Sequence, residues 1–208
     1  MTDLRALRRE LRSCRRGITE PDQRRHGKQL GRRLEALWQF RRSRRIAFYL
    51  AEDGEIDLTP AMQRARRSGK EIYLPVLRAR PSRALWFCEY RQGDRLLLNR
   101  FGIAEPDMRA RRPVPPWALD LVLLPLVGFD ECGNRLGMGG GFYDRTLAFR
   151  RHRMRWCKPR LIGVAHECQK VARIPHRPWD IQIDGVTTEA RTYLFGTAGS
   201  RQMHGRRC

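Results

Sequence analysis

The chain has 208 residues, of which 41% are hydrophobic, and this is enough to bury a substantial core in one domain. No apolar run approaches the ~20 residues of a membrane span, and the first residues, MTDLRALRREL, lack the apolar stretch of a signal peptide, which predicts a cytoplasmic protein with no membrane partner. The formal net charge is +21, but arginines occur throughout the sequence instead of forming a basic motif interleaved with aromatics, so no specific nucleic-acid partner is expected.

The N-terminal part of the sequence predicts two helices. Leucines recur at helical spacing among arginines over residues 3–16, which is typical of an amphipathic helix with a thin apolar stripe. A second helix is predicted to start at Thr19, because Pro21 lies in its first turn and Asp22 lies three residues after the cap. The apolar residues that continue this helix are Leu30, Leu34, Leu37 and Trp38.

Apolar segments rich in strand-forming residues alternate with further helices, at about 59–68 and in FYDRTLAFR at 142–150. The predicted strands are IAFYLA at 46–51, KEIYLPVL at 70–77, ALWFCEY at 84–90, a segment near RLLLNRFGI at 95–103, LDLVLLPLVGF at 119–129, LIGVAH at 161–166 and TYLF at 192–195. The two segments between 84 and 103 are expected at one sheet edge, and 119–129 in the centre.

The strands are continuously apolar and alternate with helices, which favours a parallel sheet covered on both sides. We therefore predict a single doubly wound α/β domain over residues 1–196, with a mostly parallel sheet and helices on both faces. The last residues, 197–208, are predicted to form a disordered tail.

Cysteines and histidines give no sign of a metal or catalytic cluster in the sequence. The six cysteines include no C-x-x-C pair, so free thiols are expected instead of a zinc site. His166 and His176 show no partner pattern and are assigned no catalytic role.

The stretch RLGMGGGFYDR, residues 135–145, has glycines at four of the five positions from 137 to 141. Closely spaced glycines let backbone N–H groups converge on an anion, and a following helix N-terminus and the flanking Arg135 and Arg145 would add positive charge. Phosphate binding is the favoured interpretation, and a tight turn without a ligand is the alternative. Asp144 would suit a Mg²⁺ ion beside the phosphates or, alternatively, a surface position near the helix start.

The segment LDLVLLPLVGFDECGNRLGMGGGFYDRTL resembles the signature of the 5-formyltetrahydrofolate cyclo-ligase family, also called 5,10-methenyltetrahydrofolate synthetases. The family pattern is an apolar strand ending in Pro, then Phe-Asp, Gly-x-Arg-Leu-Gly, a glycine cluster, an aromatic pair and Asp. The similarity extends to LRALRRELR, YLAEDGEIDLTP, KEIYLPVL and PWDIQIDGVTTE, and so covers nearly all of residues 4–190 in the expected order.

The resemblance implies a reaction. With MgATP, the family joins the N5-formyl group of 5-formyltetrahydrofolate to N10, forming 5,10-methenyltetrahydrofolate and releasing ADP and phosphate. Phosphorylation of the formyl oxygen would activate the carbon for attack by N10, and phosphate would then depart. The expected partners are ATP and 5-formyltetrahydrofolate, with or without a polyglutamate tail, and the expected cofactor is Mg²⁺. A monomer is expected.

The resemblance also implies the residues that bind ATP. They are Arg5, Arg8, Arg135, Leu136, Gly137, Met138, Gly139, Gly140, Gly141, Phe142, Tyr143 and Arg145. The family carries a basic pair four residues apart in its N-terminal helix. Arg8 matches the second member, whereas Leu4 occupies the position of the first, which is usually lysine, so we assign that role to the adjacent Arg5.

For the folate, the resemblance implies Leu50, Glu55, Phe101 and Tyr143. A carboxylate at Glu55 suits a pterin, whose 2-amino and ring N–H groups form a two-pronged donor edge. For Mg²⁺ it implies Asp144 and Asp180. From local pattern alone, Glu55 would be an exposed loop acid and Asp180 a turn aspartate.

Two alternatives from other classes are open at this point. Sugar-phosphate isomerases and CoA transferases use similar sheets with glycine-rich anion loops but need no ATP. A folate-retaining or nucleic-acid-binding module on the same fold would need no metal carboxylates, so Asp144, Asp180 and Glu55 argue for catalysis.

Overall fold

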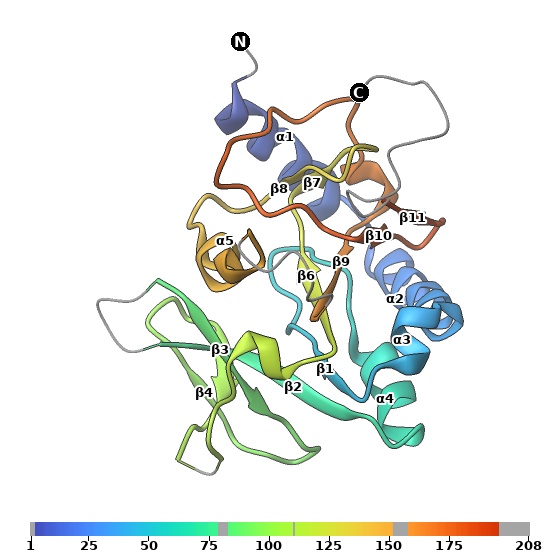
Figure 1. Ribbon diagram of the computed structural model, residues 1–208. Coiled ribbons are helices and arrows are strands. Elements are labelled where there is room, and N and C mark those ends of the chain that lie inside the picture. Colours follow the sequence, from blue (N-terminus) through green and yellow to red (C-terminus); the bar gives the residue numbers. More distant parts are fainter. Residues whose placement is uncertain (1–2, 79–82, 110, 152–157, 196–208) are drawn as a thin grey trace.

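The structure is a computed structural model, and it describes residues 3–78, 83–109, 111–151 and 158–195 (Figure 1). The α-helices are α1 (Leu4–Arg16), α2 (Glu20–Ala36), α3 (Trp38–Arg42), α4 (Thr59–Arg67) and α5 (Phe142–Thr146), with 3₁₀ turns η1 (Pro116–Ala118), η2 (Ala148–Arg151) and η3 (Glu167–Gln169). The strands are β1 (Arg45–Ala47), β2 (Glu71–Leu77), β3 (Leu85–Glu89), β4 (Leu96–Leu98), β5 (Ala104–Pro106), β6 (Leu121–Pro125), β7 (Gly128–Phe129), β8 (Arg135–Leu136), β9 (Arg160–Val164), β10 (Gly185–Thr187) and β11 (Thr192–Leu194).

A seven-stranded sheet forms the centre of the molecule, in the order β11-β10-β9-β6-β1-β2-β3. The pairs β1–β2, β1–β6, β6–β9 and β9–β10 are parallel, and only the outermost strands β3 and β11 run antiparallel to their neighbours. The predicted α/β fold class with a mostly parallel sheet is therefore confirmed. β6, from the most apolar stretch of the sequence, is the central strand, as predicted.

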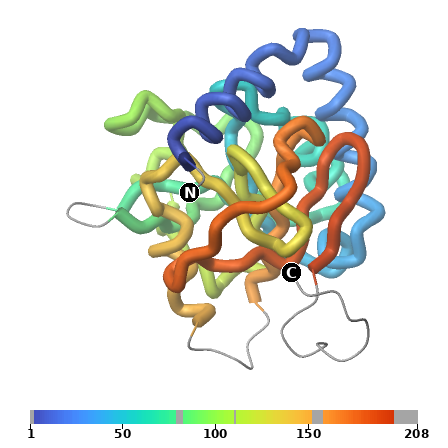
Figure 2. Tube along the Cα trace, turned by 90° about the horizontal axis from the view of Figure 1, so that it is seen from above, coloured from blue at the N-terminus to red at the C-terminus, as the bar shows by residue number. Residues whose placement is uncertain are grey.

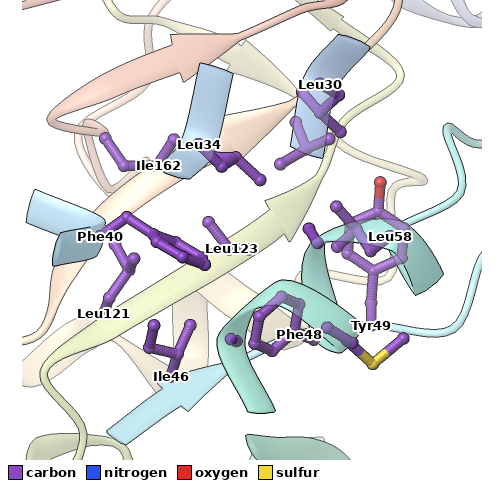
Figure 3. Close-up of a cluster of buried hydrophobic side chains, with 14 of the residues drawn as sticks. Leu30, Leu34, Phe40, Ile46, Phe48, Tyr49, Leu58, Leu121, Leu123 and Ile162 are labelled. Carbon is purple, nitrogen blue, oxygen red and sulfur yellow. The ribbon is translucent and has the colours of Figure 1, made fainter. Parts of the chain in front are cut away.

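The two faces of the sheet are covered differently. Leucines of α2, Phe40 of α3 and the alanines of α4 pack on one face against Ile46, Leu123 and Ile162 (Figure 3). On the other face, α5 and the 3₁₀ turns η1 and η2 cover a second core that includes Val122 and Leu161. Long helices therefore lie on one face only. None of the helices in the described ranges is both long and apolar enough to cross a membrane.

Helix α1 lies outside both of these layers, at the end of the sheet where β6 terminates. Asp3 caps it by accepting a hydrogen bond from the Arg5 N–H, and its leucine stripe packs on Val127, Leu136 and Ile174. Seen from above (Figure 2), α1 therefore runs alongside the yellow segment of β7 and β8 and the orange segment that follows η3. This packing brings the N-terminal arginines close to the glycine-rich loop.

Several element boundaries differ from the prediction. The apolar stretch 119–129 is not one strand, because the chain leaves the sheet after Pro125 and Gly128 then pairs with Leu136 in the β7–β8 hairpin. A Cβ at Gly128 would lie 2.6 Å from Leu11 Cδ1, so this hairpin fits closely beneath α1. The predicted helix at 142–150 stops at Thr146, whose hydroxyl donates to the Phe142 carbonyl and accepts from the Leu85 N–H.

Other differences are smaller. The second helix ends at Ala36, because Leu37 has extended backbone angles, and Trp38 begins a separate helix. The segment near 95–103 contributes β4 to a separate two-stranded sheet with β5 and does not join the main sheet. Strand β10 was missed from the sequence. The proposed tail, 197–208, lies outside the described residues, so the domain boundary at 196 stays a prediction.

Candidate functional site

A cleft of about 950 Å³ opens at the carboxyl ends of β1, β2 and β6, between α1, the glycine-rich loop and the β4–β5 hairpin. Every residue assigned to ATP, folate or Mg²⁺ from the sequence lines this cleft, except Arg5. The topology explains why, since the carboxyl ends of parallel strands meet at one edge of the sheet. The structure thus brings together positions that are more than a hundred residues apart, and their individual roles stay predictions.

The glycine-rich loop borders the cleft, and its glycines serve different purposes. Gly139 and Gly141 have φ angles of 94° and 64°, a left-handed conformation that other residues rarely adopt. Gly137 has no such angle, and a Cβ there would meet nothing closer than Arg135 Nη1 at 3.9 Å. At Gly137, the absence of a side chain therefore keeps the cleft open without being needed for the turn.

Arginines from distant segments surround this loop. Arg8 of α1 donates from Nε to the Gly137 carbonyl at 2.9 Å, and Arg145 donates to the Gly140 carbonyl. Partial burial, with the nearby positive charges of Arg177 and Arg5, lowers the pKa of Arg8. An anion bound between these arginines would relieve their mutual repulsion.

Two parts of the sequence interpretation change here. Arg5 is exposed and does not line the cleft, whereas Arg177, which the sequence did not single out, does. The helix after the glycines, α5, has only 5 residues and starts from a left-handed Gly141, and the β7–β8 hairpin separates the loop from β6. The loop and its arginines, and not a long helix dipole, therefore supply most of the positive field.

Both proposed metal carboxylates, Asp144 and Asp180, line the cleft. Asp144 Oδ1 accepts from the N–H of Ile181, the residue after Asp180, at 3.2 Å, and it also accepts from the largely buried guanidinium of Arg135. Asp180 Oδ2 accepts from the Arg177 N–H at 2.9 Å. Two carboxylates next to the arginine-lined loop form an oxygen-rich donor set that fits Mg²⁺.

Glu55 lines the same cleft as Leu50 and interacts electrostatically with two tyrosines, Tyr49 and Tyr143. Its side chain is only 14% exposed, and this burial raises its pKa to about 7, although Arg15 opposes the shift. Burial, together with the charge of Glu55, raises the pKa of Tyr143 and Tyr49. Glu55 therefore changes its charge near neutral pH, directly at the cleft.

Arg15 holds this end of the cleft together, although the sequence analysis did not identify it. It is fully buried, and it donates to the Asp53 carbonyl at 2.8 Å, the Asp53 carboxylate at 2.9 Å and the Leu126 carbonyl at 3.1 Å. Its guanidinium also lies 3.6 Å from Glu55 Oε1. A signal was present, because Arg15 continues the leucine stripe of α1 at helical spacing and so points inward.

Asp53 is the main partner of Arg15, and we expect Asp53→Asn to lower the free energy of unfolding by about 3 kcal/mol at pH 7, because it leaves a buried guanidinium without its counter-charge. Asn tolerates the left-handed φ of 54° at this position, so the change isolates the charge. Urea unfolding would measure the loss. The exposed partner Arg16 gives a matched control, since Arg16→Gln should cost less than about 1 kcal/mol.

The difference in unfolding free energy between the wild type and Asp53→Asn should depend on pH. Partial burial opposes ionisation of Asp53, but hydrogen bonds from Arg12, Arg16 and Arg15 lower its pKa to about 2. A lowered carboxyl pKa stabilises the fold above the ordinary value near 3.8, and this contribution is lost as the pH falls toward 2. The difference between the wild type and Asp53→Asn should therefore shrink at pH 3, and a constant difference would contradict the ion pair.

Aromatic side chains form one wall of the cleft. Phe101, in the β4–β5 turn, is 56% exposed and meets the Phe142 ring edge-on, with centroids 5.8 Å apart. The Arg145 guanidinium lies over Phe142, 5.9 Å from its centroid. The exposed Phe101 ring and the half-buried Phe142 ring thus offer flat apolar surface in the cleft.

The fold and the cleft together define an α/β protein with a candidate ligand site at the carboxyl edge of a parallel sheet, lined by arginines, by the glycine loop and by carboxylates. Residues 1–189 match the 5-formyltetrahydrofolate cyclo-ligase family. The chain is 38% identical to the 5-formyltetrahydrofolate cyclo-ligase of Escherichia coli K12, over 88% of this chain and 98% of that protein. It is 28% identical to the mouse protein of the same name, over 89% and 93%.

Solved structures agree with these relatives. The Aquifex aeolicus 5,10-methenyltetrahydrofolate synthetase superposes with a TM-score of 0.78 at 30% identity, covering 97% of both chains. A synthetase from Mycoplasma pneumoniae, at 21% identity and a TM-score of 0.70, shares the fold. The chain belongs to the 5-formyltetrahydrofolate cyclo-ligase family. The resemblance seen in the sequence, and the class of enzyme it implied, are confirmed.

Proposed function

We propose that this protein converts 5-formyltetrahydrofolate to 5,10-methenyltetrahydrofolate in a reaction that consumes ATP and requires Mg²⁺. The observation that carries the proposal is the meeting of the glycine loop, the two carboxylates Asp144 and Asp180, and Glu55 in one cleft of a chain from this family. Family membership favours this function over an isomerase or CoA transferase. A monomeric, cytoplasmic enzyme that accepts free or polyglutamylated folate remains the expectation.

The reaction needs ATP because a formamide carbonyl is a poor electrophile and its oxygen a poor leaving group. Transfer of the γ-phosphoryl group to the formyl oxygen makes the carbon reactive, N10 attacks it, and phosphate leaves with the former formyl oxygen. The protein mainly positions the reactants and neutralises charge in such a transfer. The backbone N–H groups of the glycine loop, with Arg8 and Arg145, would hold the phosphates at the positive end of the cleft.

Asp144 and Asp180 would hold the magnesium ion beside those phosphates. Both hydrogen bonds that the structure gives to the Asp144 carboxylate fall on Oδ1, so within the described residues Oδ2 is available as a ligand atom. Bound Mg²⁺ would supply neutralisation of the charge that develops on the transferred phosphoryl group. The guanidinium of Arg135 pairs with the Asp144 carboxylate and so would hold it in place for the metal.

Glu55 would orient the folate from the opposite end. Its ionised carboxylate can accept hydrogen bonds from the two pterin donors, while Phe101 and Phe142 offer rings for contact with the flat part of the molecule. Tyr143 follows the glycine loop and interacts with Glu55, so on this proposal the formyl group and the γ-phosphate would meet beside it.

The anion-binding role of the glycine loop can be tested separately from its fold. We expect Gly137→Ala to keep the thermal midpoint of the wild type and to raise the KM for ATP at least about tenfold, because a methyl group there finds free space in the protein but obstructs phosphate. Gly141→Ala is the contrast, since its φ of 64° and a Cβ 3.0 Å from Arg145 Nη1 should lower stability by about 1 kcal/mol. An unchanged KM for ATP in Gly137→Ala would contradict phosphate binding at this loop.

The direct test of the function is an assay of the purified protein with 5-formyltetrahydrofolate, ATP and Mg²⁺, following the absorbance of the methenyl product. Product should require all three components, and ADP and phosphate should appear in equal amounts with it. Binding of both ligands without turnover would instead identify a binding module. Product formation without ATP would overturn the proposed mechanism.

A further inference from the structure

A second cluster of polar side chains lies away from the cleft, where α2 meets the ends of β9 and β10. It consists of His26 on α2, His166 just after β9 and Glu189 after β10. None of the three lines the cleft described above. The sequence showed no partner for His166, and the structure corrects this, since the ring of His26 lies beside it with ring centroids 5.2 Å apart.

The potential ligand atoms of this cluster converge on one point. His26 Nδ1 and His166 Nδ1 are 3.0 Å apart, and the carboxylate oxygens of Glu189 lie 4.0 Å from the first and 3.9 Å from the second. Two imidazole nitrogens bound to a tetrahedral zinc ion at 2.0–2.1 Å would be roughly 3.3 Å apart. The two nitrogens are therefore within a few tenths of an ångström of that spacing, and the carboxylate needs only a small approach.

Neighbouring groups hold these side chains in place. Glu189 accepts from the Glu167 N–H through both oxygens, at 3.2 and 3.0 Å. The backbone N–H of His166 donates to the side chain of Gln169, whose amide group donates in turn to the Leu126 and Val127 carbonyls, and this fixes the chain at His166. A second partner of the kind that Glu189 has is typical of carboxylates that bind metal, because it orients the ligand before the ion binds.

A simple hydrogen bond does not account for the whole cluster. One shared proton would join the two imidazoles but would leave both Glu189 contacts, at 3.9 and 4.0 Å, beyond hydrogen-bond distance. His166 Nε2 is buried, and Nδ1 is the ring nitrogen that lies beside the other two groups. A cation at the centre would use all three groups at once.

The charge of the surroundings permits a cation. Arg15, whose charge acts on His166, is already paired with Asp53. A surface depression of about 530 Å³, lined by His26, Glu189 and the thiol-bearing Cys14 and Cys168, gives access from solvent. An ion held by the three side chains could therefore complete its coordination with water from this depression.

We propose that His26, His166 and Glu189 form a site for a borderline transition-metal cation such as Zn²⁺, separate from the proposed Mg²⁺ site. Two imidazoles and one carboxylate are ligands that suit zinc and its neighbours, whereas Mg²⁺ prefers oxygen. The ion would join α2 to the ends of β9 and β10, so its expected effect is to stabilise the fold. This proposal does not depend on the reaction in the cleft.

The test uses the full chain, freed of metal by a chelator, with Co²⁺ as a spectroscopic substitute and Zn²⁺ in competition. We expect one equivalent of Co²⁺ to give the visible absorption of a tetrahedral site, Zn²⁺ to displace it, and Zn²⁺ to raise the thermal midpoint. His26→Gln and Glu189→Gln should each weaken binding more than about tenfold. Both side chains are partly exposed, so these variants should fold even if a change at the fully buried His166 does not.

Matched controls separate this site from other binding on the same chain. His176→Ala removes an exposed histidine elsewhere on the chain, and Asp144→Asn alters the proposed Mg²⁺ site. Neither change should alter the affinity for Co²⁺. The double change Cys14→Ser with Cys168→Ser tests the thiols that border the depression. The proposal is overturned if the wild type binds no Co²⁺, if His26→Gln binds it normally, or if only the cysteine variant loses it.

Discussion

Asp144→Asn is expected to lower kcat on the order of 10²–10³-fold, the cost of removing one preorganised charge from a phosphoryl-transfer site. The carboxylate is fixed by the Arg135 guanidinium and the Ile181 N–H, so an amide of the same shape keeps the geometry but loses the charge for the metal. Steady-state kinetics at rising Mg²⁺ would measure the effect. The concentration of Mg²⁺ needed for half-maximal rate should rise together with the fall in kcat.

A purely structural role for Asp144 would give a different result. The variant would then lose thermal stability, and its Mg²⁺ requirement would match that of the wild type. Glu131→Gln is the matched control, because this carboxylate is 68% exposed, pairs only with Lys170 among the described residues and lies outside the cleft. It should show the wild-type kcat and Mg²⁺ dependence.

Glu55→Gln is expected to raise the KM for 5-formyltetrahydrofolate by about 10–100-fold while the KM for ATP changes little. An amide offers one acceptor and one donor where the pterin presents two donors, so one hydrogen bond is replaced by an unfavourable contact costing about 1–3 kcal/mol. Parallel titrations of the two substrates measure the effect. A rise of equal size in both KM values would mean that Glu55 supports the cleft as a whole and does not recognise the folate.

The pH dependence gives a second measure of Glu55. Its pKa is about 7, so the carboxylate is protonated below neutral pH and loses its capacity to accept both donors. We expect kcat/KM for the folate to fall as the pH drops through 7 in the wild type. In Glu55→Gln this step should be absent, and its persistence would assign the ionisation to another group.

The same residue lowers the stability of the fold at alkaline pH. A carboxyl pKa raised from 4.5 to about 7 stabilises the folded state only at low pH, and that contribution is lost as the pH rises through 7. The shift corresponds to roughly 3 kcal/mol once the group is ionised. Glu55→Gln should therefore raise the thermal midpoint at pH 8 but not at pH 4, which is consistent with a residue retained for binding instead of stability.

The sequence predicted the sheet well because its central strands are buried on both faces and therefore continuously apolar. It also placed the glycine loop at the ligand edge, since that follows from the strand order of an α/β sheet. Local pattern failed at Asp180, which is a turn residue by itself and enters the cleft through the fold, where its neighbour Ile181 donates to Asp144. The family resemblance supplied that position.

Other failures have a similar physical origin. Arg15 was overlooked because a charged residue in a basic helix is usually exposed, yet here Asp53 neutralises it in the interior. The partnership of His26 and His166 joins residues 140 positions apart, and no local spacing encodes such a contact. The length of the helix after the glycines was overestimated. The Thr146 hydroxyl donates to the backbone, and the helix ends there within one turn and a half.

The position of α1 over the cleft has a consequence for how the two substrates influence each other. Helix α1 contacts the glycine loop through Arg8 and Glu55 through Arg15. These two positions are about 10 Å apart along the helix axis. A ligand that orders α1 by binding at one end removes the conformational entropy loss that the second ligand would otherwise incur at the other end. On the proposed function, nucleotide and folate are then heterotropic effectors of one another, and each must raise the affinity of the other by the same factor.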